Sequence, residues 1–180
     1  MSSRAEYVPG PAFGGRAEND GERWTLVLVR ELRHPPARVW EALTDPAHLR
    51  EWAPFDADGM LDSVGATVHV TWTGTGRATE ATVTQVVAPE LLEFGDLRWE
   101  LEPWGNGTRL TLWHNIGHRY ITWGAAGWHI CFDVLDRLLA GAPIGRIAGG
   151  DAMQFEWKRL VAEYAREFGL EESGGTSKSN

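Results

Sequence analysis

Hydrophobic and polar residues alternate along several short segments in the middle of the chain. Val68, Val70 and Trp72 alternate with polar residues, and apolar residues at 97, 99 and 101 alternate with charged ones. A period of two is typical of strands with one face in the core and the other in solvent. Segments rich in β-branched or apolar residues predict further strands, and these cover residues 24–33, 79–88 and 91–94. The strands at 97–103 and 108–114 are expected to form a hairpin, because Asn106-Gly107 suits a type I′ turn.

Proline, acidic residues and a longer hydrophobic period predict the helices. Pro36 can start a short helix over 36–43, and Asp45-Pro46 can cap and start a second. From residue 122 apolar residues recur every three or four positions, which predicts a long helix that ends at Gly141. A last helix is predicted over 151–168, with a capping box at its start. Strands and helices fall in separate runs, so we expect an α+β fold with a helix packed on one face of an antiparallel sheet.

The two ends of the chain have a different composition from the middle. Residues 1–22 and 171–180 are rich in glycine and polar residues without a sustained period, which predicts flexible tails. The total of 180 residues suits a single domain, expected over 23–170.

Charge and cysteine content exclude several classes of protein. Lysine and arginine number 17 against 25 aspartate and glutamate, a net charge of −8, which argues against a nucleic-acid partner. No run of 18 apolar residues occurs, so no membrane span is predicted. Cys131 is the only cysteine, and the first residues lack the apolar run of a signal peptide. The expected location is therefore the cytoplasm.

A run between residues 30 and 52 combines proline, aromatic and acidic positions at a characteristic spacing. It contains Arg30, Pro36, Val39-Trp40, Thr44-Asp45-Pro46, Leu49 and Trp52, and later segments add Pro89-Glu90-Leu91, 107–112 and Gly127-Trp128. Together these motifs resemble the START-like helix-grip superfamily, in the branch named after activators of the heat-shock ATPase. The resemblance covers about residues 24–140, and the last helix is similar to an extension that some bacterial members carry. It departs from the branch at Val64-Gly65-Ala66, where a glycine pair is usual.

The resemblance implies a curved antiparallel sheet wrapped around a long C-terminal helix, two short helices after the first strand, and a cavity between sheet and helix. It implies no single chemistry, because members include lipid carriers, cyclases and hydroxylase subunits.

Residues of one parity on a curved sheet converge on the helix that covers it. The candidate ligand-binding residues are Trp52, Phe55, Val70, Trp72, Trp99, Leu112, His114, Trp128 and Phe132. Two interpretations stay open, since these rings can fill the core or line an apolar cavity. The small residues at 124–127 likewise either allow close backbone approach or leave room for a ligand. Several converging tryptophans, with the resemblance, favour the cavity.

Histidine and cysteine give little sign of other chemistry. His114 and His118 lie at a predicted strand end with no further ligand motif, so no metal or cofactor is expected. Cys131 has no basic neighbour in sequence, and no nucleophile motif occurs, so no catalytic residue is predicted. His114 shares the parity of the inward leucines and is expected as a polar group in the cavity. His129, off the main apolar stripe, is expected at a flank or interface.

Three functions follow as hypotheses. The first is a cytoplasmic binding protein for an apolar or aromatic small molecule, held between sheet and helix. The second is a polyketide cyclase or dehydratase type of enzyme, in which His114 moves a proton on such a ligand. The third, taken from the family name, is a module that contacts a chaperone through the outer face of the sheet. Association of two copies into a homodimer is a further possibility. Whether the protein is an enzyme stays open.

Overall fold

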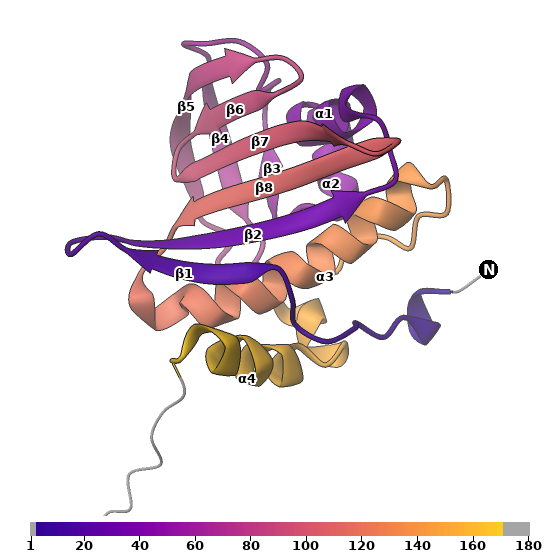
Figure 1. Ribbon diagram of the computed structural model, residues 1–180. Coiled ribbons are helices and arrows are strands. Elements are labelled where there is room, and N and C mark those ends of the chain that lie inside the picture. The colour runs from indigo at the N-terminus through magenta and orange to yellow at the C-terminus, as the bar shows by residue number, and fades with distance from the viewer. Residues whose placement is uncertain (1–2, 171–180) are drawn as a thin grey trace, which may run out of the picture.

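Eight antiparallel strands form one sheet that curls around a long helix within residues 3–170, the part of the chain that the computed structural model describes (Figure 1). Their order across the sheet is β1-β2-β8-β7-β6-β5-β4-β3. The strands are β1 (Gly15–Asn19), β2 (Trp24–Leu32), β3 (Phe55–Ala57), β4 (Thr67–Trp72), β5 (Ala78–Val87), β6 (Leu91–Phe94), β7 (Leu97–Trp104) and β8 (Gly107–Asn115). The predicted α+β helix-grip fold is confirmed, and the short β3 is a strand that the sequence did not predict.

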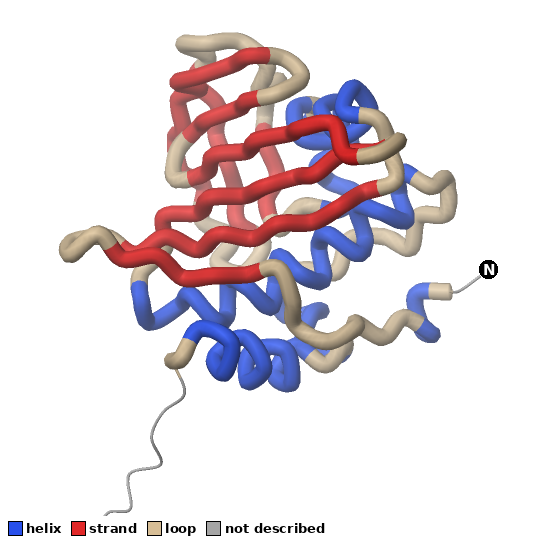
Figure 2. Tube along the Cα trace, viewed as in Figure 1, coloured by secondary structure: helices blue, strands red, loops and turns tan. Residues whose placement is uncertain are grey.

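The helices lie together on the inner side of the sheet (Figure 2). Two short ones, α1 (Pro36–Thr44) and α2 (Pro46–Trp52), follow β2 as expected, and the Asp45 carboxylate caps α2 by accepting from the Ala47 amide at 2.9 Å. The long helix α3 (Ile121–Leu139) runs across the sheet, and α4 (Trp157–Phe168) packs against it. Within residues 3–170, no helix combines the length and apolar content needed to cross a membrane.

The hairpin between β7 and β8 forms, with a turn that differs from the expected one. Trp104 pairs with Gly107, so the two loop residues are Gly105 and Asn106. Gly105 has a positive φ of 56°, which suits a turn with glycine at its first central position. Gly107 belongs to β8, where the Leu32 carbonyl oxygen lies 2.0 Å from the place a Cβ would take. Glycine is therefore required at 107 for close strand packing rather than for the turn.

The expectation of a flexible tail over residues 1–22 is wrong for residues 3–22. Strand β1 pairs with β2 from Gly15 opposite Leu28 to Asn19 opposite Trp24. The Arg4 guanidinium donates to the carbonyl oxygens of Gly145 and Arg146 at 2.9 and 2.8 Å. Composition failed here because backbone pairing and single polar contacts, rather than a hydrophobic period, stabilise this segment.

Tyr7 fastens the N-terminal segment to α3. Its side chain is 5% exposed, and its hydroxyl donates to the Asp133 carboxylate. The same carboxylate pairs with the Arg30 guanidinium of β2 at 2.6 Å. Burial, and then the negative charge of Asp133, raise the pKa of the Tyr7 hydroxyl, which therefore stays a donor. One acidic side chain on α3 thus links the N-terminal segment and the sheet.

His129 lies in the interior, so its predicted place at a flank or interface is wrong. The side chain is 1% exposed, and its Nδ1 lies 2.7 Å from the hydroxyl of Tyr164 on α4. That hydroxyl donates to the Phe13 carbonyl oxygen at 3.3 Å. The outer side of α3 is covered by α4 and by the N-terminal segment, and His129 lies on that side. The sequence showed only one apolar stripe on α3, and His129 is not part of that stripe.

The last helix begins later than the sequence predicts. Residues Gly149–Gln154 form a 3-10 turn, and α4 starts at Trp157. Glu156 adopts a left-handed φ of 59°, which interrupts the helix that the capping box suggested. Met153, expected on the apolar stripe, is 55% exposed. The predicted tail at 171–180 lies outside the described residues.

Candidate functional site

A pocket of about 560 Å³ opens beside the first turns of α3. Most of its walls come from four parts of the chain: the end of β4 with its turn, the end of β8, the first turns of α3, and the segment that leads into α4. Pro54 and Thr79 complete the lining. Aromatic side chains on these walls include Trp72, Trp123, Trp128 and Trp157, and His114 is among them. The lining is mostly apolar, as in pockets that hold small organic molecules.

Two glycines of α3 explain why space remains at this place. A Cβ on Gly124 would meet Ile116 Cδ1 at 2.9 Å, so this glycine allows the helix to approach the sheet. A Cβ on Gly127 would meet no atom within 4 Å, so this position faces open space. Ala125 and Ala126 between them are buried. Both interpretations of the 124–127 segment are therefore correct, each for a different residue: Gly124 allows close backbone approach, and Gly127 leaves open space.

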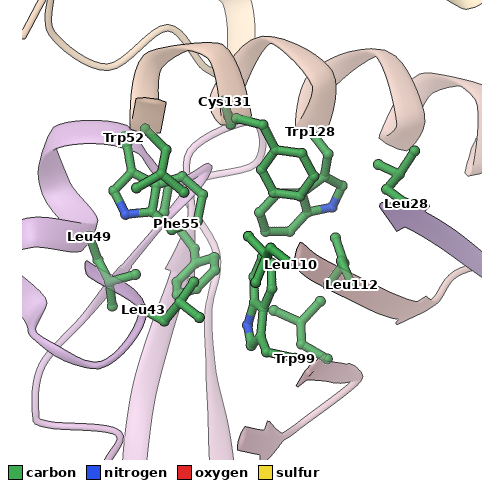
Figure 3. Packing of buried hydrophobic residues seen from close by; sticks show 14 of the residues in the cluster. Leu28, Leu43, Leu49, Trp52, Phe55, Trp99, Leu110, Leu112, Trp128 and Cys131 are labelled. Carbon is green, nitrogen blue, oxygen red and sulfur yellow. The ribbon is translucent and has the colours of Figure 1, made fainter. Parts of the chain in front are cut away.

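The remaining interior is packed with aromatic rings. Trp52 lies 6.1 Å from Trp99 and 6.4 Å from Phe132 between ring centroids, and Trp99 lies 5.4 Å from Trp128. Figure 3 shows Trp52, Phe55, Trp99 and Trp128 directed toward one another between α3 and the strands. These separations are normal for rings in mutual contact, so this part of the space between sheet and helix is filled.

The nine candidate residues therefore divide into two groups. Six are 3% exposed or less and lie in the packed core away from the pocket wall: Trp52, Phe55, Val70, Trp99, Leu112 and Phe132. Three line the pocket: Trp72, His114 and Trp128. The division follows the length of α3, with the pocket at its first turns and the packed rings further along.

His114 is held in one orientation by two tryptophans. The Trp128 indole Nε1 donates to His114 Nδ1 at 3.1 Å, which leaves the ring proton on Nε2. The imidazole stacks on Trp72 with 5.6 Å between centroids and 8° between planes. No described residue forms a hydrogen bond with Nε2. Every fully buried polar side-chain atom of residues 3–170 has a hydrogen-bond partner, so Nε2, which has none, is not fully buried. Nε2 therefore retains open surface, and it can donate a hydrogen bond to a molecule in the pocket.

Apart from this surface at Nε2, the imidazole is surrounded by other side chains, and burial keeps His114 uncharged. It lowers the pKa of the imidazole to about 4 because a charged ring loses its hydration there. Near pH 7 the side chain is a neutral donor. A base of such low pKa is poorly matched to proton transfer at that pH.

Folding stability should fall between pH 7 and pH 5, in part because of His114. An unfolded histidine binds a proton near pH 6.5, whereas folded His114 binds one near pH 4, so the unfolded state gains protons first as pH falls. The expected contribution is about 2 kcal/mol of stability lost at pH 5. Urea titrations at both pH values should show that His114→Gln, which retains an acceptor for Trp128, reduces the difference by about that amount. An unchanged difference would contradict the buried, neutral state.

Other groups with reactive side chains have clear structural roles. Burial raises the pKa of the Cys131 thiol to about 12, and its Sγ lies 3.7 Å from the Ile147 carbonyl oxygen, so it is not a nucleophile near neutral pH. Within the described part of the chain, one group has donor atoms close enough for a metal: Glu41, Asp45 and His48. It lies at α1 and α2, outside the pocket wall, and Asp45 already caps α2.

Several pocket residues were not candidates from the sequence. Trp123 and Met153 are 47% and 55% exposed and lie at the pocket, with Trp157 6.0 Å from Trp123 between centroids. Arg77 lies in the turn after β4 and also lines the pocket. The available signal was Trp123, an aromatic residue that falls outside the predicted apolar stripe of the long helix. Met153 and Trp157 were expected on the buried stripe of the last helix, so nothing in the sequence placed them at a pocket. No signal marked Arg77.

Comparison with known proteins gives one family match and several structural neighbours. CalU16 from Micromonospora echinospora has a TM-score of 0.60 at 19% identity, over 91% of this chain and 98% of its own. DynU16, a protein in the dynemicin biosynthetic locus, has a TM-score of 0.59 at 23% identity, over 69% of this chain and 50% of its own. Protein MLL2253 from Mesorhizobium loti has a TM-score of 0.57 at 24% identity, over 65% and 97%.

At these identities the likeness establishes a shared fold. No curated protein matches the chain. The family model described as "Activator of Hsp90 ATPase homolog 1-like protein" matches residues 33–140, which is more than half of the chain and includes the elements from α1 to α3. The chain therefore belongs to the Activator of Hsp90 ATPase homolog 1-like family, with the START-like helix-grip fold.

Proposed function

We propose that this protein binds an apolar, aromatic small molecule in the pocket beside the first turns of α3. The observation that carries the proposal is that two neighbouring parts of the interior differ in packing. The aromatic rings of the core are in contact, whereas a pocket of about 560 Å³ with mostly apolar walls stays open next to them. Exposed apolar surface in a concave site is costly unless a ligand covers it. The neutral Nε2–H of His114 offers such a ligand one directed hydrogen bond.

The properties of His114 favour a binding function over catalysis by proton transfer. His114 has a pKa of about 4, and the general bases of enzymes usually have values near the working pH. The position of DynU16 in a biosynthetic locus supports a small-molecule ligand for this fold, and a cyclase-type enzyme stays the alternative. The free, buried Cys131 suits the proposed cytoplasmic location. A homodimer and a chaperone contact stay predictions from the sequence alone.

An uncharged fluorescent probe tests the proposal. N-phenylnaphthylamine should bind saturably, one molecule per chain, with emission shifted to the blue and energy transfer from tryptophan. Two equally exposed tryptophans provide matched variants: Trp123 is 47% exposed at the pocket, and Trp104 is 46% exposed at the β7–β8 turn. Trp123→Ala should weaken binding by about fivefold to tenfold, because it removes stacking surface. Trp104→Ala should leave the affinity unchanged.

The mutants decide the outcome, since ten tryptophans give a large background. Equal effects at Trp123 and Trp104, or no saturable binding by the folded wild-type protein, would reject the pocket as a ligand site.

A further inference from the structure

The pocket wall carries one charged side chain among the described residues, and its charge is positive. Arg77 is the single charged residue among the described residues that line the pocket, and no carboxylate is among them. This is unexpected for a chain with 25 acidic and 17 basic residues. An apolar pocket needs no charge to hold an uncharged ligand, so the arginine adds something that the apolar walls do not explain.

The Arg77 guanidinium has no ion-pair partner among residues 3–170. The turn that carries it is nevertheless ordered, because the Gly76 amide donates to the Trp72 carbonyl at 2.8 Å. The Arg77 amide donates to the Thr75 hydroxyl oxygen at 3.2 Å. Backbone contacts therefore position the residue at the pocket, and its side chain is left available.

Three carboxylates on segments near the pocket are already paired. Asp56 on β3 accepts from Arg146 at 2.5 Å. Asp151, in the 3-10 turn beside the pocket, pairs with Arg4 at 3.5 Å. Glu156, just before α4, pairs with Arg159 at 3.0 Å. Each of these acidic groups has a cation of its own, so none of them neutralises Arg77.

Two helices add positive potential on the same side. Trp123 lies in the first turn of α3 and Trp157 is the first residue of α4, and both line the pocket. The N-terminal turn of a helix carries a partial positive charge. The Nε2–H of His114 is a donor as well. The polar features at this site therefore favour an acceptor that carries negative charge.

We propose that the ligand of this pocket is an aromatic anion, whose acidic group pairs with Arg77 while its rings lie among Trp72, Trp123 and Trp128. This inference rests on the proposed function and adds the chemical class of the ligand. A carboxylate, a sulfonate or an ionised phenol next to an aromatic body meets the requirement.

Two probes that share an aromatic frame and differ by one sulfonate group test the inference. Anilinonaphthalene sulfonate carries a sulfonate on the aromatic frame of N-phenylnaphthylamine, which is uncharged. The wild-type protein should bind the sulfonate more tightly than the uncharged probe, and added salt should reduce that preference. Arg77→Gln should weaken binding of the sulfonate by about fivefold to tenfold and leave N-phenylnaphthylamine within about twofold. Arg77→Lys should restore part of the loss.

A matched control removes the same charge elsewhere. Arg38 is exposed on α1, outside the pocket wall, so Arg38→Gln changes the net charge equally and should leave both affinities unchanged.

The outcomes separate the two proposals. If N-phenylnaphthylamine binds but the sulfonate gains nothing, or if Arg77→Gln and Arg38→Gln act alike, the anionic ligand is rejected and the binding pocket stands. If neither probe binds to folded protein, both proposals are rejected.

Discussion

Phe132→Ala should lower the free energy of unfolding by about 3–5 kcal/mol, the usual cost of removing a large aromatic ring from a packed core. Phe132 is 2% exposed, and its ring lies 5.8 Å from Trp128 and 6.1 Å from Trp99 between centroids. The Arg30 guanidinium lies 5.6 Å from the same ring. The alanine would leave a cavity bounded by rigid indoles, which cannot collapse into it. A urea titration of the variant measures the loss.

Phe13 provides a control for the same substitution. It is 47% exposed, so Phe13→Ala should cost less than about 1.5 kcal/mol, including its contact with Arg30 at 4.8 Å. A loss below about 0.5 kcal/mol for Phe132→Ala would contradict its place in the packed core.

Gly127→Leu should abolish probe binding while the protein stays folded. The space beside this glycine is empty for at least 4 Å, and the residue lines the pocket, so a leucine would occupy the volume that a ligand needs. Leucine also favours a helix by close to 1 kcal/mol over glycine, so stability should be unchanged or higher. N-phenylnaphthylamine titration and urea titration of the same preparation measure the two effects.

The same substitution three residues earlier should have the opposite effect on stability. At Gly124 the first carbon atom of a side chain would already lie 2.9 Å from Ile116 Cδ1 and 3.6 Å from Leu26 Cδ2. Gly124→Leu is therefore expected to cost about 1–3 kcal/mol through overpacking. Probe binding by Gly127→Leu at the wild-type affinity would show that the ligand site lies elsewhere.

The sequence predicted most of the fold because its main elements repeat a regular period. The strand β4 at Thr67–Trp72 follows from alternation, and the helix α3 at Ile121–Leu139 follows from three-to-four spacing. Strand β1 has no such period, because it is a short edge strand that depends on backbone pairing with β2. The start of α4 was wrong because a left-handed Glu156 outweighed the capping signal, and this conformation leaves no mark in the sequence.

The sequence predicted which side chains face the interior, but not which of them line the pocket. Parity indicates that Trp72 and Trp99 lie on the inner face, yet it does not say how far along α3 each one falls. Trp99 meets three rings and is packed, whereas Trp72 lies at the open end. Arg77 was missed for a different reason: an arginine in a turn of glycine and threonine resembles any solvated loop residue, and only its place on the pocket wall distinguishes it.

The arrangement of α3 also determines how freely this protein can diversify. The second half of the helix carries Phe132 and Leu135 into the core, where substitution threatens the fold. The first half presents Trp123 and Gly127 to the pocket, where substitution alters shape and polarity at little cost to stability. A single helix thus separates the residues that hold the fold from those that shape the proposed ligand site, so changes on two of its turns can alter the pocket while the scaffold persists.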